Sequence, residues 1–130
     1  MEATQLIETI AQTATLKTKL QQTLSAYENL DYHLLNEVLD DECLYQDMRK
    51  ISFILEQKRI FDLLRKKGDT RMLLSTNICT GCFDRAPVFV LTGNHSGWKH
   101  ALYFEFTGDV ITDIFRCSEQ SNWLDWMMPF

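Results

Sequence analysis

Asp47 and His100 are the two side chains in this sequence that best suit acid–base chemistry. A carboxylate in apolar surroundings can abstract a proton, and a histidine can exchange one near neutral pH. Each residue also has a plain structural explanation. Asp47 can be an N-cap or turn residue before a helix, and His100 can be a core histidine hydrogen-bonded to a neighbour. We prefer these structural explanations unless the two side chains come within hydrogen-bonding reach of each other.

Cys79 and Cys82 form the sequence Cys-Thr-Gly-Cys, which has the spacing of half a zinc site or of a redox dithiol. The sequence holds no second pair of this kind, and the motif lies between two predicted strands, where no helix dipole lowers a thiol pKa. We therefore expect a hairpin loop with two thiols, no metal and no cofactor. Cys43 and Cys117 lie in apolar segments, with Cys117 away from this loop, and all four cysteines are expected to be reduced.

Length and charge limit the remaining classes of protein. The chain has 130 residues without a repeat or a Pro/Gly-rich linker, which predicts one domain over residues 1–130. Its 13 basic and 18 acidic residues give a net charge of −5, which argues against a nucleic-acid partner. The apolar runs are too short to cross a bilayer, and the N-terminus lacks the basic and apolar regions of a signal peptide. We expect a cytoplasmic protein that makes no membrane contact.

The elements that must position these residues divide into a helical half, residues 1–67, and a sheet half, residues 68–118. Apolar periodicity predicts one long helix over residues 6–27, a short helix after the N-cap Asp31, and a third helix over residues 50–67 that ends at Gly68. The buried stripe expected for the third helix is Ile51, Ile54, Leu55, Phe61 and Leu64. The expected strands are residues 42–46, 70–79, 87–92, 98–107 and 110–117. This order predicts an α+β fold with three helices packed on a curved antiparallel sheet.

Alternation within the strand at residues 98–107 indicates which face is buried. Trp98, His100 and Leu102 share one face with Phe104 and Phe106, which we expect to point toward the helices. The residues expected on the opposite, mixed face are Lys99, Tyr103, Glu105 and Thr107. The strand at residues 70–79 carries an apolar row, Met72, Leu74, Thr76 and Ile78. We expect this row to lie on its outer face, covered by a second subunit.

The order of elements and two local segments resemble the nuclear transport factor 2-like superfamily, which includes ketosteroid isomerases, scytalone dehydratase and polyketide cyclases. Residues 27–47 look like the family's small helix, acidic pair and strand ending in aspartate. Residues 104–111, Phe-Glu-Phe-Thr-Gly-Asp-Val-Ile, look like its penultimate hairpin. The resemblance covers about residues 20–118. It implies a cone-shaped sheet with a pocket between the concave face and the helices, and a homodimer through the outer sheet face.

The resemblance places Asp47 on the catalytic base of the ketosteroid isomerases. The same alignment places Thr23 where the tyrosine donor stands and Leu102 where the second acid stands. Each absent oxyanion donor would forfeit about 3 kcal/mol of barrier reduction, so isomerisation of that type is not expected. A histidine paired with an acid, as in a dehydratase, is the remaining catalytic interpretation, through His100.

Two functions remain open at this point. The first is a pocket protein for a small apolar molecule, with lyase or isomerase chemistry through Asp47 and His100 as an open question. The residues expected to line its pocket are Tyr27, Tyr45, Trp98, Leu102 and Phe104. The second is a non-enzymatic dimeric scaffold whose sheet faces bind proteins. An apolar-filled cone favours the scaffold, and an open pocket favours ligand chemistry. The apolar C-terminal tail, residues 119–130, is expected to pack on the domain.

Overall fold

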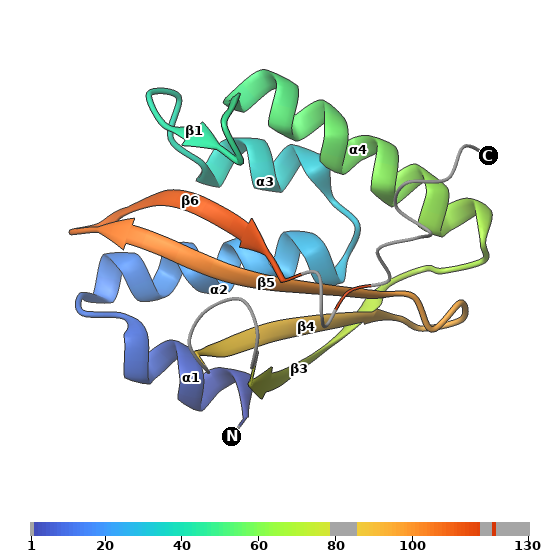
Figure 1. The fold of residues 1–130 in the computed structure, drawn as a ribbon, viewed down its shortest axis with the longest axis horizontal. Helices are drawn as coiled ribbons and strands as arrows, with labels where there is room; N and C mark the ends of the chain where they lie inside the picture. Colours follow the sequence, from blue (N-terminus) through green and yellow to red (C-terminus); the bar gives the residue numbers. More distant parts are fainter. Residues whose placement is uncertain (1, 79–85, 118–120, 122–130) are drawn as a thin grey trace.

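The computed structural model of the chain describes residues 2–78, 86–117 and 121. Four helices lie against one face of a four-stranded antiparallel sheet, and a two-stranded hairpin lies at its edge (Figure 1). The predicted α+β class is therefore confirmed. The Cys79–Cys82 motif and the apolar tail lie outside the described residues. None of the helices in the described part of the chain is long and apolar enough to cross a bilayer.

The expected first helix is two helices, α1 (Ala3–Ile10) and α2 (Ala14–Glu28), so the prediction of three helices is wrong by one. The division falls at Thr13, whose side chain accepts a hydrogen bond from the Leu16 amide and so caps the start of α2. The Thr13 hydroxyl donates to the carboxylate of Asp109, in the turn between the last two strands. This contact with a distant residue accompanies the local cap at Thr13.

The next helix begins after its predicted N-cap, and the fourth matches its predicted bounds to within one residue. The side chain of Asp31 accepts hydrogen bonds from the amides of His33 and Leu34 and caps α3 (Tyr32–Val38). The fourth helix, α4 (Lys50–Lys66), is followed by Gly68 at φ 99°, a left-handed conformation that glycine adopts without steric cost.

A hairpin replaces the single short strand expected at residues 42–46. Its strands are β1 (Leu44–Tyr45) and β2 (Met48–Arg49). The two residues between them, Gln46 and Asp47, have φ values of 52° and 63°, which are typical of a type I′ turn. Asp47 is therefore a turn residue, as one of its structural explanations proposed. The N-cap of α4 is Arg49, so the N-cap explanation for Asp47 is wrong.

The main sheet has the order β3-β4-β5-β6, so each strand pairs with its neighbour in the chain. The strands are β3 (Met72–Ile78), β4 (Pro87–Gly93), β5 (Lys99–Thr107) and β6 (Val110–Arg116). Their bounds agree with the predicted strands to within two residues. The register shifts between Glu105 and Phe106, where β5 and β6 form an irregularity typical of a β-bulge.

The predicted inward face of β5 is confirmed. Trp98, His100, Leu102 and Phe104 are all buried. A second, smaller apolar cluster lies around Ala101, on the opposite side of this strand. Its buried members are Val88, Val90, Ala101 and Cys117, with Tyr103 packed against them.

The apolar row of β3 faces inward, contrary to the expectation that it is an outer face. Met72 is buried in the main core, and Leu74 packs against that core. Both α1 and α2 contact β3. Its other face carries Leu73, which is 48% exposed. The helices of the same chain therefore cover the Met72 end of the surface that the sequence assigned to a second subunit, whereas Ile78 at its other end is 52% exposed.

Two cysteines lie within the described residues. Cys43 is a free thiol, as predicted. Cys117, at the end of β6, is disulfide-bonded, so the prediction that it is reduced is wrong. The prediction rested on the absence of a signal peptide and on a supposed distance from the other cysteines, and neither observation determines a disulfide.

Candidate functional site

The predicted inner-face residues meet in a buried cluster between α2, α4 and β5. The ring of His100 stacks on Trp98 at 5.5 Å between centroids and lies 5.7 Å from Tyr27. The Tyr27 hydroxyl donates a 2.9 Å hydrogen bond to Oε1 of Gln57. Gln57 is buried, and the sequence analysis missed it. Its position on the inward face of α4, between Phe53 and Phe61, was the available signal.

Burial keeps this cluster uncharged. Loss of hydration, together with the smaller effect of the nearby positive charge of Arg116, lowers the pKa of His100 to about 3. Burial raises the pKa of Tyr27 well above its usual range. At neutral pH the imidazole is therefore neutral and a very weak base, and the phenol keeps its proton. Neither group is poised for proton transfer near pH 7.

The structure does not bring Asp47 and His100 together. Asp47 is exposed in the β1–β2 turn. The preceding residue, Gln46, donates from its side chain to the carbonyl of Ile114, which is the cross-strand partner of Phe104. His100 lies four residues along β5 from Phe104, a separation of about 13 Å. The carboxylate therefore remains at the surface, far from the buried imidazole.

Tyr45 is buried, but its hydroxyl is already engaged. It donates a 2.8 Å hydrogen bond to the carbonyl of Ile111 and accepts one of 2.9 Å from the amide of Asp40. Its ring lies 5.4 Å from that of Phe53. Burial raises the pKa of Tyr45 above its usual range. Tyr45 thus anchors the loop before β1 to β6.

Leu102 and Phe104 belong to the main buried apolar cluster. The buried side chains packed between the sheet and the helices include Leu16, Leu20, Leu24, Phe53, Phe61, Phe89, Leu102 and Phe104. A small apolar cavity of about 150 Å³ lies beside Phe104, near the start of β4, with Ile10 and Phe89 in its wall. Sites for small-molecule ligands usually occupy about 300–1,000 Å³. This cavity is smaller than that range.

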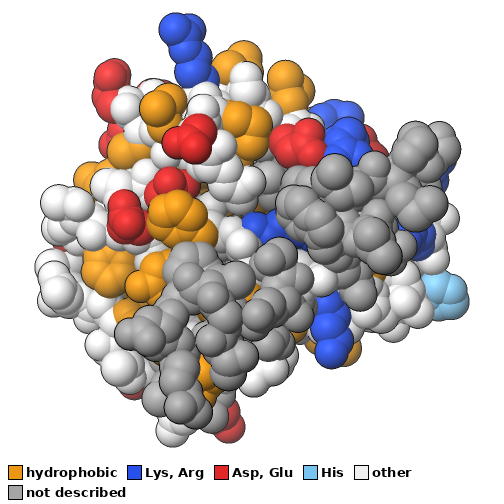
Figure 2. All heavy atoms as spheres, viewed as in Figure 1, with side chains coloured by type: hydrophobic (Ala, Val, Ile, Leu, Met, Phe, Trp, Pro, Cys, Tyr) orange, Lys and Arg blue, Asp and Glu red, His pale blue; other side chains and the backbone are white. Residues whose placement is uncertain are grey.

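A larger groove lies on the outer side of α3 and α4. It has a volume of about 700 Å³ and runs between α3, the loop before β1, and the first turns of α4. Three large apolar side chains are exposed in it: Leu44 by 55%, Ile51 by 69% and Leu55 by 60%. Figure 2 shows hydrophobic and acidic side chains interspersed at the upper left of the molecule, where Figure 1 places β1 and the start of α4. Ile51 and Leu55 were expected in the buried stripe of α4, and that expectation is wrong.

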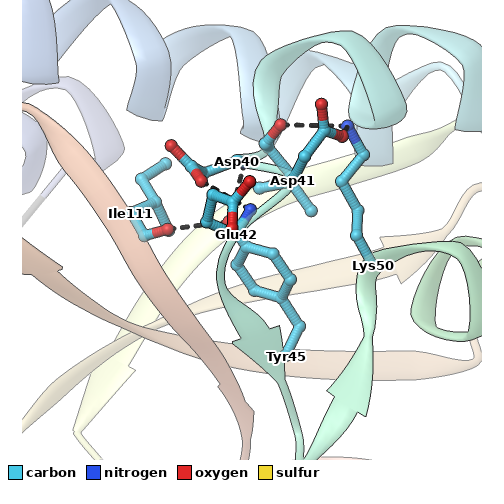
Figure 3. A network of polar contacts seen from close by, with 7 residues as sticks. Asp40, Asp41, Glu42, Tyr45, Lys50 and Ile111 are labelled. Atoms are coloured by element: carbon cyan, nitrogen blue, oxygen red, sulfur yellow. Dashed lines mark hydrogen bonds and ion pairs between the residues drawn. The ribbon is translucent and has the colours of Figure 1, made fainter.

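Asp41 and Glu42, in the acidic loop at residues 40–42, form one rim of this groove. The loop is held by a network of polar contacts (Figure 3). Lys50 Nζ lies 2.6 Å from the carboxylate of Asp41 and donates to the carbonyl of Leu39. The carboxylate of Asp40 accepts a 2.8 Å hydrogen bond from the amide of Glu42. Together with the Tyr45 hydroxyl, these contacts fix the loop against β6 and α4.

Cys43 lies in the groove wall but is not an activated nucleophile. Loss of hydration, followed by the negative charge of Asp40, raises the pKa of its thiol. The thiol is therefore protonated at neutral pH. Among the described residues, no group of three or more His, Cys, Asp or Glu side chains is placed to hold a metal ion.

Comparisons with protein-family models, with curated proteins and with solved structures give no match to this chain.

Proposed function

We propose that this protein is a non-catalytic binding module, in which a cone of the nuclear transport factor 2-like type serves as a scaffold and a partner protein binds on its outside. The single observation that carries the proposal is the groove between α3, β1 and α4, with Leu44, Ile51 and Leu55 exposed together in it. Contiguous exposed apolar side chains bordered by polar ones are typical of protein-interaction sites. The sequence left two functions open, and we favour the second, protein binding. The binding surface is this groove and not the sheet faces.

The placement of the candidate catalytic residues also supports a non-catalytic role. Asp47 is exposed, and His100 is buried in a neutral cluster. The hydroxyls of Tyr27 and Tyr45 already have hydrogen-bond partners within the protein. A reaction in the interior would need a base that can reach the substrate and donors aimed at the developing charge. These four residues are engaged in the fold or turned to solvent.

Native mass spectrometry of the purified full chain tests the non-catalytic part of the proposal. We expect the mass of the polypeptide alone, because the residues expected to line a pocket are buried in the apolar core. A small organic molecule that stays bound under native conditions and is released on denaturation would instead support the pocket-protein hypothesis. In that case His100→Phe and Tyr27→Phe, which both change the buried cluster, should reduce its retention.

Site-specific photo-crosslinking tests the binding part. A photoreactive amino acid replaces Ile51 in one variant and Leu73, on the outer face of β3, in a matched control. Each variant is irradiated in an extract of cells that make the protein naturally. We expect a polypeptide adduct from position 51 that is absent from position 73 and is lost when Leu55→Glu is added. Equal labelling from both positions would contradict the proposal.

A further inference from the structure

We propose that the partner enters this groove as an amphipathic helix whose apolar face packs on Leu44, Ile51 and Leu55, and whose flank near the loop at residues 40–42 carries Lys or Arg. The inference rests on the proposed function and names the chemistry of the partner. Its four supports are the geometry of the apolar residues, the backbone pairing around them, the charge of the rim and the rigidity of that rim.

The geometry of the apolar residues suits a helix. Ile51 and Leu55 are four residues apart, so they form a ridge along the exposed side of α4. Tyr32 and Asn36, also four residues apart, line the groove from α3. Ridges at this spacing accept the side chains of a third helix, which typically inserts residues at i, i+3 or i+4, and i+7.

The backbone pairing around the groove does not favour a bound strand. Leu44 and Tyr45 of β1 pair with β2 on one side, and β1 contacts β6 on the other. The contact with β6 is a packing contact and not a hydrogen-bonded ladder, but it leaves little room for an added strand beside β1. A helix satisfies its own backbone hydrogen bonds and binds through side chains alone, which is what the groove offers.

The charge of the rim selects a basic flank. Three carboxylates lie in succession at Asp40, Asp41 and Glu42, and Lys50 pairs with Asp41. Glu42 is exposed. Arg49, the cross-strand partner of Leu44, is also exposed in the groove, so basic residues are favoured on the flank near the loop and disfavoured near Arg49. The net charge of −5 attracts a basic partner at long range and repels a second copy of this chain.

The loop at residues 40–42 is already held in place in the protein without a partner. The Tyr45 hydroxyl and Lys50 tie the loop to β6 and α4. Association therefore does not have to order this loop, which removes one of the entropic costs of binding.

The test measures fluorescence anisotropy of a synthetic peptide probe with the full chain at low ionic strength. The probe has about 18 residues, enough for about five helical turns, with Leu at helical spacing, Lys on one flank of the Leu face and Gln elsewhere. One comparison peptide has the same composition with Leu and polar residues in strict alternation, and another has Glu in place of every Lys. We expect the helical Leu/Lys probe to bind about tenfold or more tightly than either comparison peptide.

Protein variants locate the binding. Leu55→Glu should weaken the helical Leu/Lys probe about tenfold or more, because it places a charge in the centre of the apolar contact. Glu42→Gln should weaken it severalfold at low salt and much less at high salt. The matched control Leu73→Glu should leave it unchanged. Circular dichroism checks that each variant stays folded, which exposed positions allow.

Each contrary outcome has a distinct meaning. No binding by the helical probe, equal binding of the helical and alternating peptides, or equal effects of Leu55→Glu and Leu73→Glu would overturn the helix inference. If light scattering shows a dimer that Leu55→Glu converts to a monomer, the occupant is a second copy; the helix inference then fails and the binding-module proposal stands. A retained small molecule in native mass spectrometry would instead overturn the proposed function itself.

Discussion

The burial of His100 predicts that the protein loses stability as the pH falls from 7 to 5. The pKa of this histidine is about 3 in the folded state and 6.5 for an exposed histidine. Between these values the unfolded chain binds a proton that the folded chain excludes, so stability is present above pH 6.5 and decreases as the pH falls. pH 5 lies about 1.5 units below the pKa of the histidine in the unfolded chain, so protonation stabilises the unfolded chain. The free energy of unfolding is therefore about 2 kcal/mol lower at pH 5 than at pH 7.

Urea unfolding at pH 7 and pH 5 measures this loss. Carboxylates also titrate with the fold, so the informative quantity is the difference between wild type and His100→Phe, which keeps a ring between Trp98 and Tyr27. We expect wild type to lose about 2 kcal/mol more than the variant over this interval. The exposed His33, changed to Gln, is the matched control and should behave as wild type. The same pH dependence in His100→Phe as in wild type would refute the reasoning.

Three further predictions concern residues that fix the loops. Asp69 accepts hydrogen bonds from the amides of His95 and Ser96 and from the Ser96 hydroxyl; burial alone would raise its pKa, but these bonds lower it overall. Asp69→Asn should therefore cost about 2 kcal/mol in urea unfolding at pH 7, and the difference from wild type should shrink as the pH falls below 4. Gly93→Ala should lower the melting temperature by several degrees, because its Cβ would lie 2.3 Å from Oδ2 of Asp69; an unchanged melting temperature would contradict this. Tyr45→Phe should cost about 1–3 kcal/mol and speed hydrogen exchange at the Asp40 amide, which loses its acceptor; unchanged exchange would show that the anchor is dispensable.

Local sequence determined much of the fold. The alternation from Trp98 to Phe106 predicted the inward face of β5, the N-cap Asp31 predicted α3, and Gly68 predicted the end of α4. Each of these signals depends on residues within a few positions of one another, which is why they could be read directly. The resemblance to the nuclear transport factor 2-like superfamily stays an expectation.

The features that the sequence did not predict depend on distant contacts. The break before α2 involves Asp109, and the hairpin turn at Gln46 is held by Asp113 and the Ile114 carbonyl of β6. Neither contact has a local signal, because the partners are far apart in the chain. The two left-handed turn residues, Gln46 and Asp47, are also not glycines, so no glycine marks the hairpin in the sequence.

The groove was missed for a related reason. Ile51 and Leu55 are spaced like a buried helical stripe, and apolar spacing does not tell which side of a helix meets the sheet. In α4 that side carries Phe53 and Gln57 together with three of the predicted residues, Ile54, Phe61 and Leu64. Because Gln57 is polar, the apolar periodicity on the buried side of α4 is interrupted, and the spacing of Ile51 and Leu55 stands out instead.

The central claim is that this protein works through the groove on its outside and not through the buried cluster between the helices and the sheet. An amide proton–nitrogen correlation spectrum of the full chain, titrated with the helical Leu/Lys peptide, tests it most directly. We predict shift changes concentrated around Leu44, Ile51 and Leu55, with the amides of Trp98 and His100 unmoved. Changes concentrated at Trp98 and His100, with the groove unaffected, would contradict the account.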